Sequence, residues 1–269
     1  MHADTTKQFS EIAVVKINYF RRNPVGFLMS TMMAGAYVGI GIMLILTLGN
    51  EAESVSQKLI MGCFFGITLT LIVFAGAELF SGHIMYMTFG YFYNKISIFT
   101  VIKDWIICWY GNLLGAVMLS ILFVLGGGGG FLNDNTALVH TLADTKMNSG
   151  IIELIARASI CNWLICLAIW MSSKTTNDTA KCILIFWCLF AFVAAGFEHG
   201  IANMTVFAIS LLGNHPDGVT FTGMIYNLAW VSIGNIIGGA GFIGVAYFLT
   251  SNPIIKGTAP QITGNEPAE

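Results

Sequence analysis

Long apolar stretches alternate with short polar segments along most of this chain. Six stretches are long enough to cross a bilayer, which takes ~20 apolar residues per helix, and they cover residues 25–49, 59–92, 101–125, 151–171, 182–212 and 224–249. The pattern predicts three parts: an amphipathic N-terminal segment over 1–24, a transmembrane domain over 25–249 and a tail over 250–269. The tail is polar and contains Pro and Gly, so we expect it to be disordered.

The second and fifth apolar stretches are too long for one plain crossing at 1.5 Å rise per residue. Polar residues and glycine interrupt both, around Glu78 and Gly82 in the second and between Gly196 and Gly200 in the fifth. A helix broken in lipid leaves backbone groups unpaired, at several kcal/mol each, and is tolerated only inside protein or beside water. We therefore expect both helices to be broken and the breaks to line a path through the protein.

Two short strings indicate an internal repeat. Ala75-Gly76-Ala77-Glu78 matches the string 195–198 at an offset of 120, and the string 111–116 matches 234–239 at an offset of 123. Each half holds three helices, and an odd number places the two halves in opposite orientations. The sequence therefore predicts an all-α membrane protein in which six transmembrane helices form two inverted three-helix repeats, about 25–125 and 151–249. Broken helices in such repeats commonly form the permeation site.

Composition and charge narrow the class further. The chain is 56% hydrophobic and 10% charged, against ~45–50% and ~25% in soluble domains, which excludes a soluble enzyme, a disordered chain and a small disulfide scaffold. The net charge of −2 offers no basic surface for nucleic acid. With the N-terminus inside, nine Lys and Arg lie in inner segments and two in outer loops, so we expect both termini to be cytoplasmic. The six cysteines form no Cys-x-x-Cys pair, and we expect no metal or cofactor.

His199 is the strongest candidate for chemistry, because it lies at the second break in an otherwise apolar helix. Ionisable groups at membrane depth are functional by default. Glu78 and Glu198 occupy equivalent positions in the two repeats. We expect them to accept hydrogen bonds from backbone donors freed at the breaks, since a bare carboxylate would repel an anion.

Two further groups of residues surround the breaks. Bulky apolar side chains could narrow the path and exclude water: Leu69, Leu79, Phe80 and Phe192. Polar side chains could bind a small anion or tie helices together: Ser81, Asn162, Asn203 and, in the loop before the fourth span, Lys146.

Three strings carry a resemblance to a known family. Residues 75–83 (AGAELFSGH), 161–171 (CNWLICLAIWM) and 196–204 (GFEHGIANM) resemble the formate/nitrite transporter family, and the likeness extends over nearly all of 20–250. Within the family, the Gly-His after Ser81 is more similar to the nitrite and hydrosulphide channels than to the formate channels.

The resemblance implies a multi-pass protein of the bacterial cytoplasmic membrane with an aquaporin-like protomer, one pore per protomer and a homopentameric assembly. It implies that His199 lies between two apolar constrictions, one formed by Leu79 with Phe192 and the other by Phe65, Leu69 and Phe80. Ser81 stands where the family often has threonine, at the gate on the second helix. Lys146 and Asn162 match a lysine and an asparagine that the family has near its pore.

Three functions follow from these observations. The first is a channel for small monovalent anions, namely hydrosulphide, nitrite or formate. The second is an aquaporin-like channel for neutral solutes, which fits the repeat but lacks paired Asn-Pro-Ala motifs. The third, a membrane-embedded enzyme or redox subunit, would need paired histidines or clustered metal ligands, whereas the five histidines here are scattered. We therefore predict a channel and no enzymatic activity.

Overall fold

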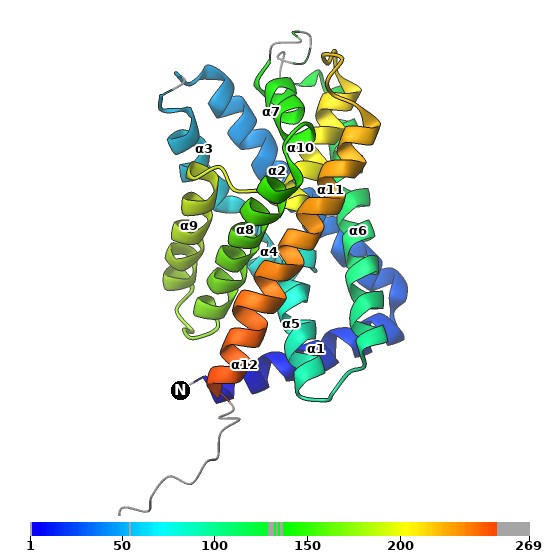
Figure 1. Cartoon of the computed structure of the whole chain (residues 1–269), viewed down its shortest axis with the longest axis vertical. Helices are drawn as coiled ribbons and strands as arrows, with labels where there is room; N and C mark the ends of the chain where they lie inside the picture. The colour runs from blue at the N-terminus through cyan, green and yellow to red at the C-terminus, as the bar shows by residue number, and fades with distance from the viewer. Residues whose placement is uncertain (1, 54, 129–131, 133, 135–136, 252–269) are drawn as a thin grey trace, which may run out of the picture.

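The computed structural model describes residues 2–53, 55–128, 132, 134 and 137–251, and nearly all of them lie in helices that pack side by side (Figure 1). The predicted tail beyond residue 251 lies outside the described residues. The long helices are α2 (Pro24–Glu51), α6 (Ile98–Leu125), α8 (Ile151–Ser172) and α11 (Phe221–Ile236), which continues through a π-helical turn, η2 (Ile237–Val245), into α12 (Ala246–Ser251). Helix α1 (Ala3–Arg22) lies across one end of the bundle, and the short helix α7 (Leu138–Met147) lies at the other.

The second and fifth spans are broken, as the sequence predicts. The second consists of α3 (Gln57–Phe65), α4 (Ile67–Ala75) and α5 (Phe80–Phe92), and the fifth of α9 (Asp178–Ala194) and α10 (Gly200–Leu212). Among the described residues, five helical segments are by themselves long and apolar enough to cross a membrane. The remaining span needs α9 and α10 together, because the break divides it into two short helices.

Both breaks begin with the same backbone feature. Gly76 has a φ of 73° and Gly196 a φ of 74°, which is the left-handed region that glycine enters without steric cost. A side chain at either position would be strained whatever the space around it. The repeat seen in the sequence therefore extends to the dihedral angle that ends α4 and α9.

Small residues let the long helices approach closely. Helix α6 packs against α2, and α11 packs against α8. A Cβ atom on Gly115 would lie 1.8 Å from the carbonyl oxygen of Met32, and one on Gly238 would lie 2.1 Å from that of Ser159. The Gly-x-x-x-Gly pairs of α6 and of the α11–η2 helix are thus close-contact sites between backbones.

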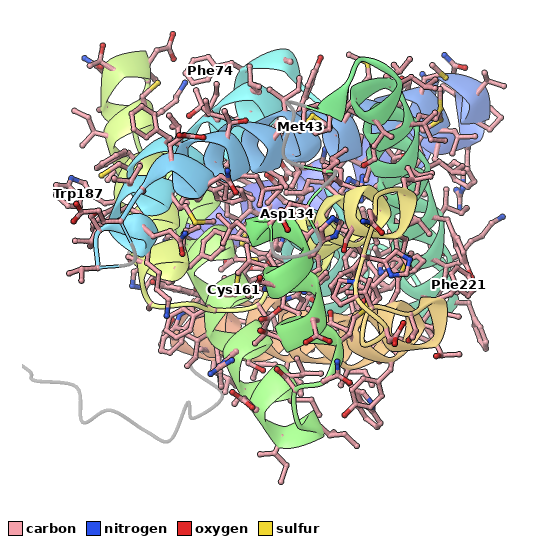
Figure 2. All side chains as sticks on the ribbon, turned by 90° about the horizontal axis from the view of Figure 1, so that it is seen from above. Met43, Phe74, Asp134, Cys161, Trp187 and Phe221 are labelled. Carbon is pink, nitrogen blue, oxygen red and sulfur yellow. The ribbon has the colours of Figure 1, made fainter. Side chains whose placement is uncertain are left out.

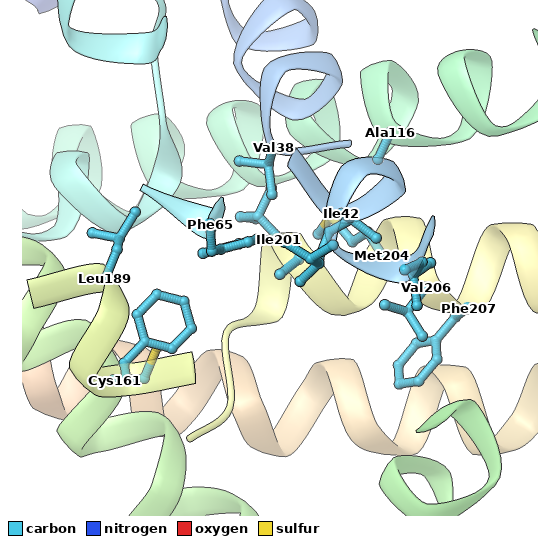
Figure 3. Packing of buried hydrophobic residues seen from close by; sticks show 14 of the residues in the cluster. Val38, Ile42, Phe65, Ala116, Cys161, Leu189, Ile201, Met204, Val206 and Phe207 are labelled. Carbon is cyan, nitrogen blue, oxygen red and sulfur yellow. The ribbon is translucent and has the colours of Figure 1, made fainter. Parts of the chain in front are cut away.

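The apolar core lies in the middle of the bundle, where α2, α3, α9 and α10 meet (Figure 3). Val38, Phe65, Leu189 and Ile201 are all buried there. Large apolar side chains also cover the outside of the bundle: Trp187 and Phe221 point outward on opposite sides (Figure 2) and are 60% and 65% exposed. An apolar outer surface of this kind suits lipid or a neighbouring subunit rather than water.

Candidate functional site

Ser81 and His199 meet at the centre of the protein, where the two breaks face each other. The Ser81 Oγ lies 2.5 Å from the His199 Nε2, and both residues are buried. Each stands at the start of the helix that follows its break, because α5 begins at Phe80 and α10 at Gly200. The His199 Nδ1 is buried and has no hydrogen-bond partner among the described residues, which leaves one ring nitrogen free to meet a permeating species.

Asn162 ties this centre to the second repeat. Its Nδ2 lies 2.7 Å from the Asn235 carbonyl oxygen and 3.4 Å from that of Ser81. It contacts the backbone of Ser81 rather than its hydroxyl. The contact therefore fixes the position of α5 relative to α8 and α11.

A very small cavity of about 10 Å³ lies beside His199, and its other lining side chains are apolar except for Thr68. Its volume is at the lower limit for a single water molecule. Leu69 and Leu79 line this cavity and also the larger cavity on the α1 side. Phe65 and Phe192 line it and the larger cavity on the α7 side, and their rings pack edge to face with centroids 5.3 Å apart.

These contacts change the pairing expected for the constrictions. All four side chains line the central cavity, but Leu79 shares the larger α1-side cavity with Leu69, and Phe192 shares the α7-side cavity with Phe65. Phe80 lines a separate apolar groove between α6 and α11 on the outside of the bundle. Since α5 begins at Phe80, Leu79 and Phe80 project in different directions, and only Leu79 faces the central cavity.

Asn112 and Asn235 provide the hydrogen bonds that the breaks need. The Asn112 Oδ1 accepts from the Phe80 N–H and its Nδ2 donates to the Glu78 carbonyl oxygen, at 2.9 and 3.0 Å. Asn235 does the same at the second break, accepting from the Gly200 N–H at 3.1 Å and donating to the Glu198 carbonyl oxygen at 3.3 Å. An amide can both donate and accept, whereas an ionised carboxylate only accepts.

The expectation for the two glutamates therefore needs correction. The described contacts of their carboxylates are with side chains and not with the backbone N–H groups of the breaks. Glu198 accepts two hydrogen bonds of 2.8 Å from the Lys146 Nζ and one of 2.6 Å from the Asn203 Nδ2. The Asn203 Nδ2 also donates to the Asn227 Oδ1 at 2.9 Å. We call Lys146, Glu198, Asn203 and Asn227 the α7-side quartet.

A second chain of four residues lies on the other side of the centre. Lys16 of α1 pairs with the Glu78 carboxylate. The same carboxylate lies 2.7 Å from the His83 Nε2, and the His83 Nδ1 lies 2.8 Å from the Asp104 Oδ2. We call Lys16, Glu78, His83 and Asp104 the α1-side quartet. Each of its members except Lys16 is buried.

The two quartets face two vestibules of similar size. The α1-side vestibule has a volume of about 270 Å³ and is lined by Lys16 and Lys181 together with Glu78 and His83. The α7-side vestibule, about 250 Å³, has as its charged lining residues Lys58, Lys146, Arg157 and Glu198. Cationic side chains outnumber carboxylates in both, so each vestibule favours an anion over a cation.

Three members of the quartets, Lys16, Asp104 and Asn227, were not predicted from the sequence, and His83 was not assigned to the site. The signal was present in the repeat offsets. His83 and Asn203 each lie five residues after the equivalent glutamates, and Asp104 and Asn227 differ by the 123 positions that relate Asn112 to Asn235. Position-by-position correspondence between the two repeats therefore marks these residues in the sequence.

Two broken helices that face each other in inverted repeats, with a buried imidazole between two positively charged vestibules, define a membrane channel. The chain matches the formate/nitrite transporter family over residues 3–249 and belongs to that family.

Individual relatives support this assignment. The chain is 43% identical to the nitrite transporter NirC of Escherichia coli over 271 residues, which covers 100% of this chain and 99% of the relative. It is 34% identical to the formate channel BtFdhC of Bacillus thuringiensis over 222 residues, covering 80% and 83% of the two chains.

Solved structures share the fold. An FNT family ion channel superposes with a TM-score of 0.90 at 43% identity, covering 93% of this chain and 99% of that one. A pentameric formate channel with formate bound gives a TM-score of 0.68 at 26% identity, covering 84% and 96%. The predictions of an all-α membrane fold, of this family and of a transport protein rather than an enzyme are confirmed.

Proposed function

We propose that this protein is a channel for small monovalent anions and that nitrite is its main substrate. The observation that carries the proposal is the central cavity of about 10 Å³, which lies between two positively charged vestibules and is lined by His199, Thr68 and otherwise apolar side chains. The similarity to the nitrite transporter NirC over the full length of the chain supports nitrite in particular.

The proposed path treats charge differently at its ends and at its centre. Lysines in the vestibules attract an anion, because an unlike charge lowers its energy by about 4 kcal/mol at 4 Å in a medium of effective dielectric ~20. The apolar constriction then penalises a bare charge, since burying an unpaired ion is costly. A hydrogen bond or proton from His199, which Ser81 holds by its Nε2, reduces that penalty. The pathway residues we propose are His199, Ser81, Asn162, Lys146 and Asn203.

The remaining proposals concern assembly and orientation. We infer that five copies assemble, as in the pentameric formate channel whose fold this chain shares, each with its own pore. We infer that the α1 end faces the bacterial cytoplasm, because most Lys and Arg lie in the segments at that end. The mass of the solubilised complex tests the first inference, and five copies are expected.

Flux measurements on the purified protein in liposomes test the substrate. We expect uptake of nitrite, with formate and hydrosulphide carried by the same pore, and no swelling in glycerol. Empty liposomes serve as the control. Glycerol swelling without nitrite uptake would favour the neutral-solute channel and contradict the proposal.

A further inference from the structure

The two quartets are built around the equivalent glutamates of the repeats, each paired with a lysine from a preceding helix, but they differ at two repeat-related positions. The α7-side quartet has the neutral amides Asn203 and Asn227 there, whereas the α1-side quartet has His83 and Asp104. In both quartets the lysine contacts the glutamate, the glutamate contacts the residue five positions later, and that residue contacts the fourth member. The difference is therefore one of charge and not of architecture.

Both ring nitrogens of His83 lie against carboxylate oxygens. The Nδ1 is 2.8 Å from the Asp104 Oδ2 and the Nε2 is 2.7 Å from the Glu78 Oε2. A neutral imidazole donates through one nitrogen and presents a lone pair on the other, whereas an imidazolium donates through both. Only the charged ring avoids placing a lone pair against an ionised carboxylate.

The charge count of the two quartets also indicates that His83 is protonated. On the α7 side, Lys146 balances Glu198 and the two asparagines add nothing. On the α1 side, Lys16 faces two carboxylates, so the quartet has a net charge of −1 with a neutral His83 and zero with a protonated one. The side chains of His83 and Asp104 are each 1% exposed, so water screens this charge very little.

We propose that His83 is a positioning residue that holds a fixed positive charge between Glu78 and Asp104 and so keeps net negative charge out of the α1-side half of the anion path. This inference rests on the proposed function, because the sign of the charge matters only if an anion passes. It also gives Glu78 two cationic partners, which fix its carboxylate beside the first break.

Charged or titratable groups approach His83 from several elements. Glu78 in the break, Asp104 of α6 and Tyr86 of α5 contact the ring directly. Lys16 of α1 and Cys108 of α6 contact Glu78 instead, through its carboxylate and its carbonyl oxygen. On α2, the side chain that packs against the imidazole is the apolar ring of Phe27, with centroids 5.9 Å apart. Asp104 and Glu78 are thus the groups whose charge His83 compensates.

A charge-compensation series tests the role. We expect His83→Asn to lower nitrite flux in liposomes about tenfold or more, because it leaves an uncompensated buried carboxylate near the path. The double variant His83→Asn/Asp104→Asn copies the Asn–Asn pair of the α7 side and is expected to restore flux to within about threefold of wild type. Asn227→Asp, which adds one negative charge to the α7-side quartet, is the matched control and should lower flux as His83→Asn does. If the double variant conducts as poorly as the single one, or the single one conducts like wild type, the inference is wrong.

Nitrogen-15 NMR of histidine-labelled protein measures the charge directly, without reference to transport. At about pH 7.5 free imidazole is mostly neutral, since its pKa is ~6.5, whereas we expect the His83 ring to show two protonated nitrogens. The signal missing from His83→Asn protein assigns the resonance. A neutral ring at this pH would overturn the inference alone, while a wild-type protein that carries no nitrite would contradict the proposed function.

Discussion

At the scale of single residues, two asparagines stabilise the broken helices at membrane depth. Asn112 and Asn235 each satisfy one N–H and one C=O at a break, and each freed group would otherwise cost several kcal/mol in lipid. Asn112 also donates to the Thr31 carbonyl oxygen at 2.7 Å, and Asn235 donates to that of Ala158 at 2.9 Å. One side chain thus joins a break to two long helices, so the side chains of Ser81 and His199 are not needed to pair these backbone groups and contact each other instead.

Substitution of His199 tests whether the imidazole acts on the permeant. We expect His199→Phe to remove the pH dependence of nitrite flux between about pH 5 and 8, the range in which an imidazole changes charge. His199→Asn keeps a hydrogen-bond donor beside Ser81 but takes up no proton, so it should conduct with a weaker response to pH. Flux in liposomes at several pH values is the measurement. A wild-type pH profile in His199→Phe protein would make the histidine a structural group only.

Truncation of Phe192, with Phe80 as its matched control, tests the constriction. Both side chains are 3% exposed, so replacing either with alanine should cost about 3–5 kcal/mol of stability. Phe192 lines the central cavity and Phe80 lines the outer groove. We therefore expect Phe192→Ala to raise conductance and admit larger anions, and Phe80→Ala to leave both unchanged. Equal permeation in the two variants would show that Phe192 only packs the core.

Sequence alone could identify the residues that meet at the centre but not all their partners. Ser81 and His199 stand out because they are polar residues at interruptions of apolar helices. Lys16 and Asp104 do not, since one lies in an amphipathic helix and the other near the polar start of α6, where charge is ordinary. The direction of a side chain at a break also depends on the backbone, which is why Phe80 was placed in the constriction and lies elsewhere.

At the scale of secondary-structure elements, glycine determines how closely the long helices pack. The close approach of α6 to α2 and of the α11–η2 helix to α8 depends on positions where no Cβ fits, such as Gly115 and Gly238. The strings 111–116 and 234–239, which the repeat pairs, each contain a Gly-x-x-x-Gly pattern, and this pattern is typical of close helix contacts. The π-helical turn η2 and the short helix α7 were not predicted, because neither changes the hydrophobic pattern that marks a span.

Alanine substitution at Gly115 tests the helix contact. The new Cβ would lie 1.8 Å from the Met32 carbonyl oxygen, so α2 and α6 must move apart, at a cost of about 1–3 kcal/mol or more. Gly241→Ala is the matched control, since nothing lies within 4 Å of the Cβ it adds. Thermal unfolding in detergent should show a clear drop in Tm for Gly115→Ala and almost none for Gly241→Ala. Equal Tm values would contradict the close backbone contact.

Inverted symmetry shapes the whole molecule. It gives the path two vestibules, two quartets and two breaks, with the small apolar cavity and the Ser81–His199 pair between them. The backbones of the two repeats match closely, but their charged side chains do not. The α1-side quartet contains an additional carboxylate and an imidazole where the α7-side quartet has two amides. A protein built this way can treat its two sides differently without changing its fold.

The position of the chain ends tests the architecture as a whole. Helix α1 contacts α12, and the His2 and Tyr247 rings lie with centroids 5.1 Å apart, so the two ends of the described chain lie at the same end of the bundle. Six crossings return the chain to the side on which it started, and from the excess of Lys and Arg we propose that this side is the cytoplasm. Reporter fusions active only on one side of the membrane should therefore report a cytoplasmic location for both termini. A fusion at residue 149, in the loop before α8, is the control and should report the opposite side. One terminus on each side would require an odd number of crossings, which the inverted repeat does not allow.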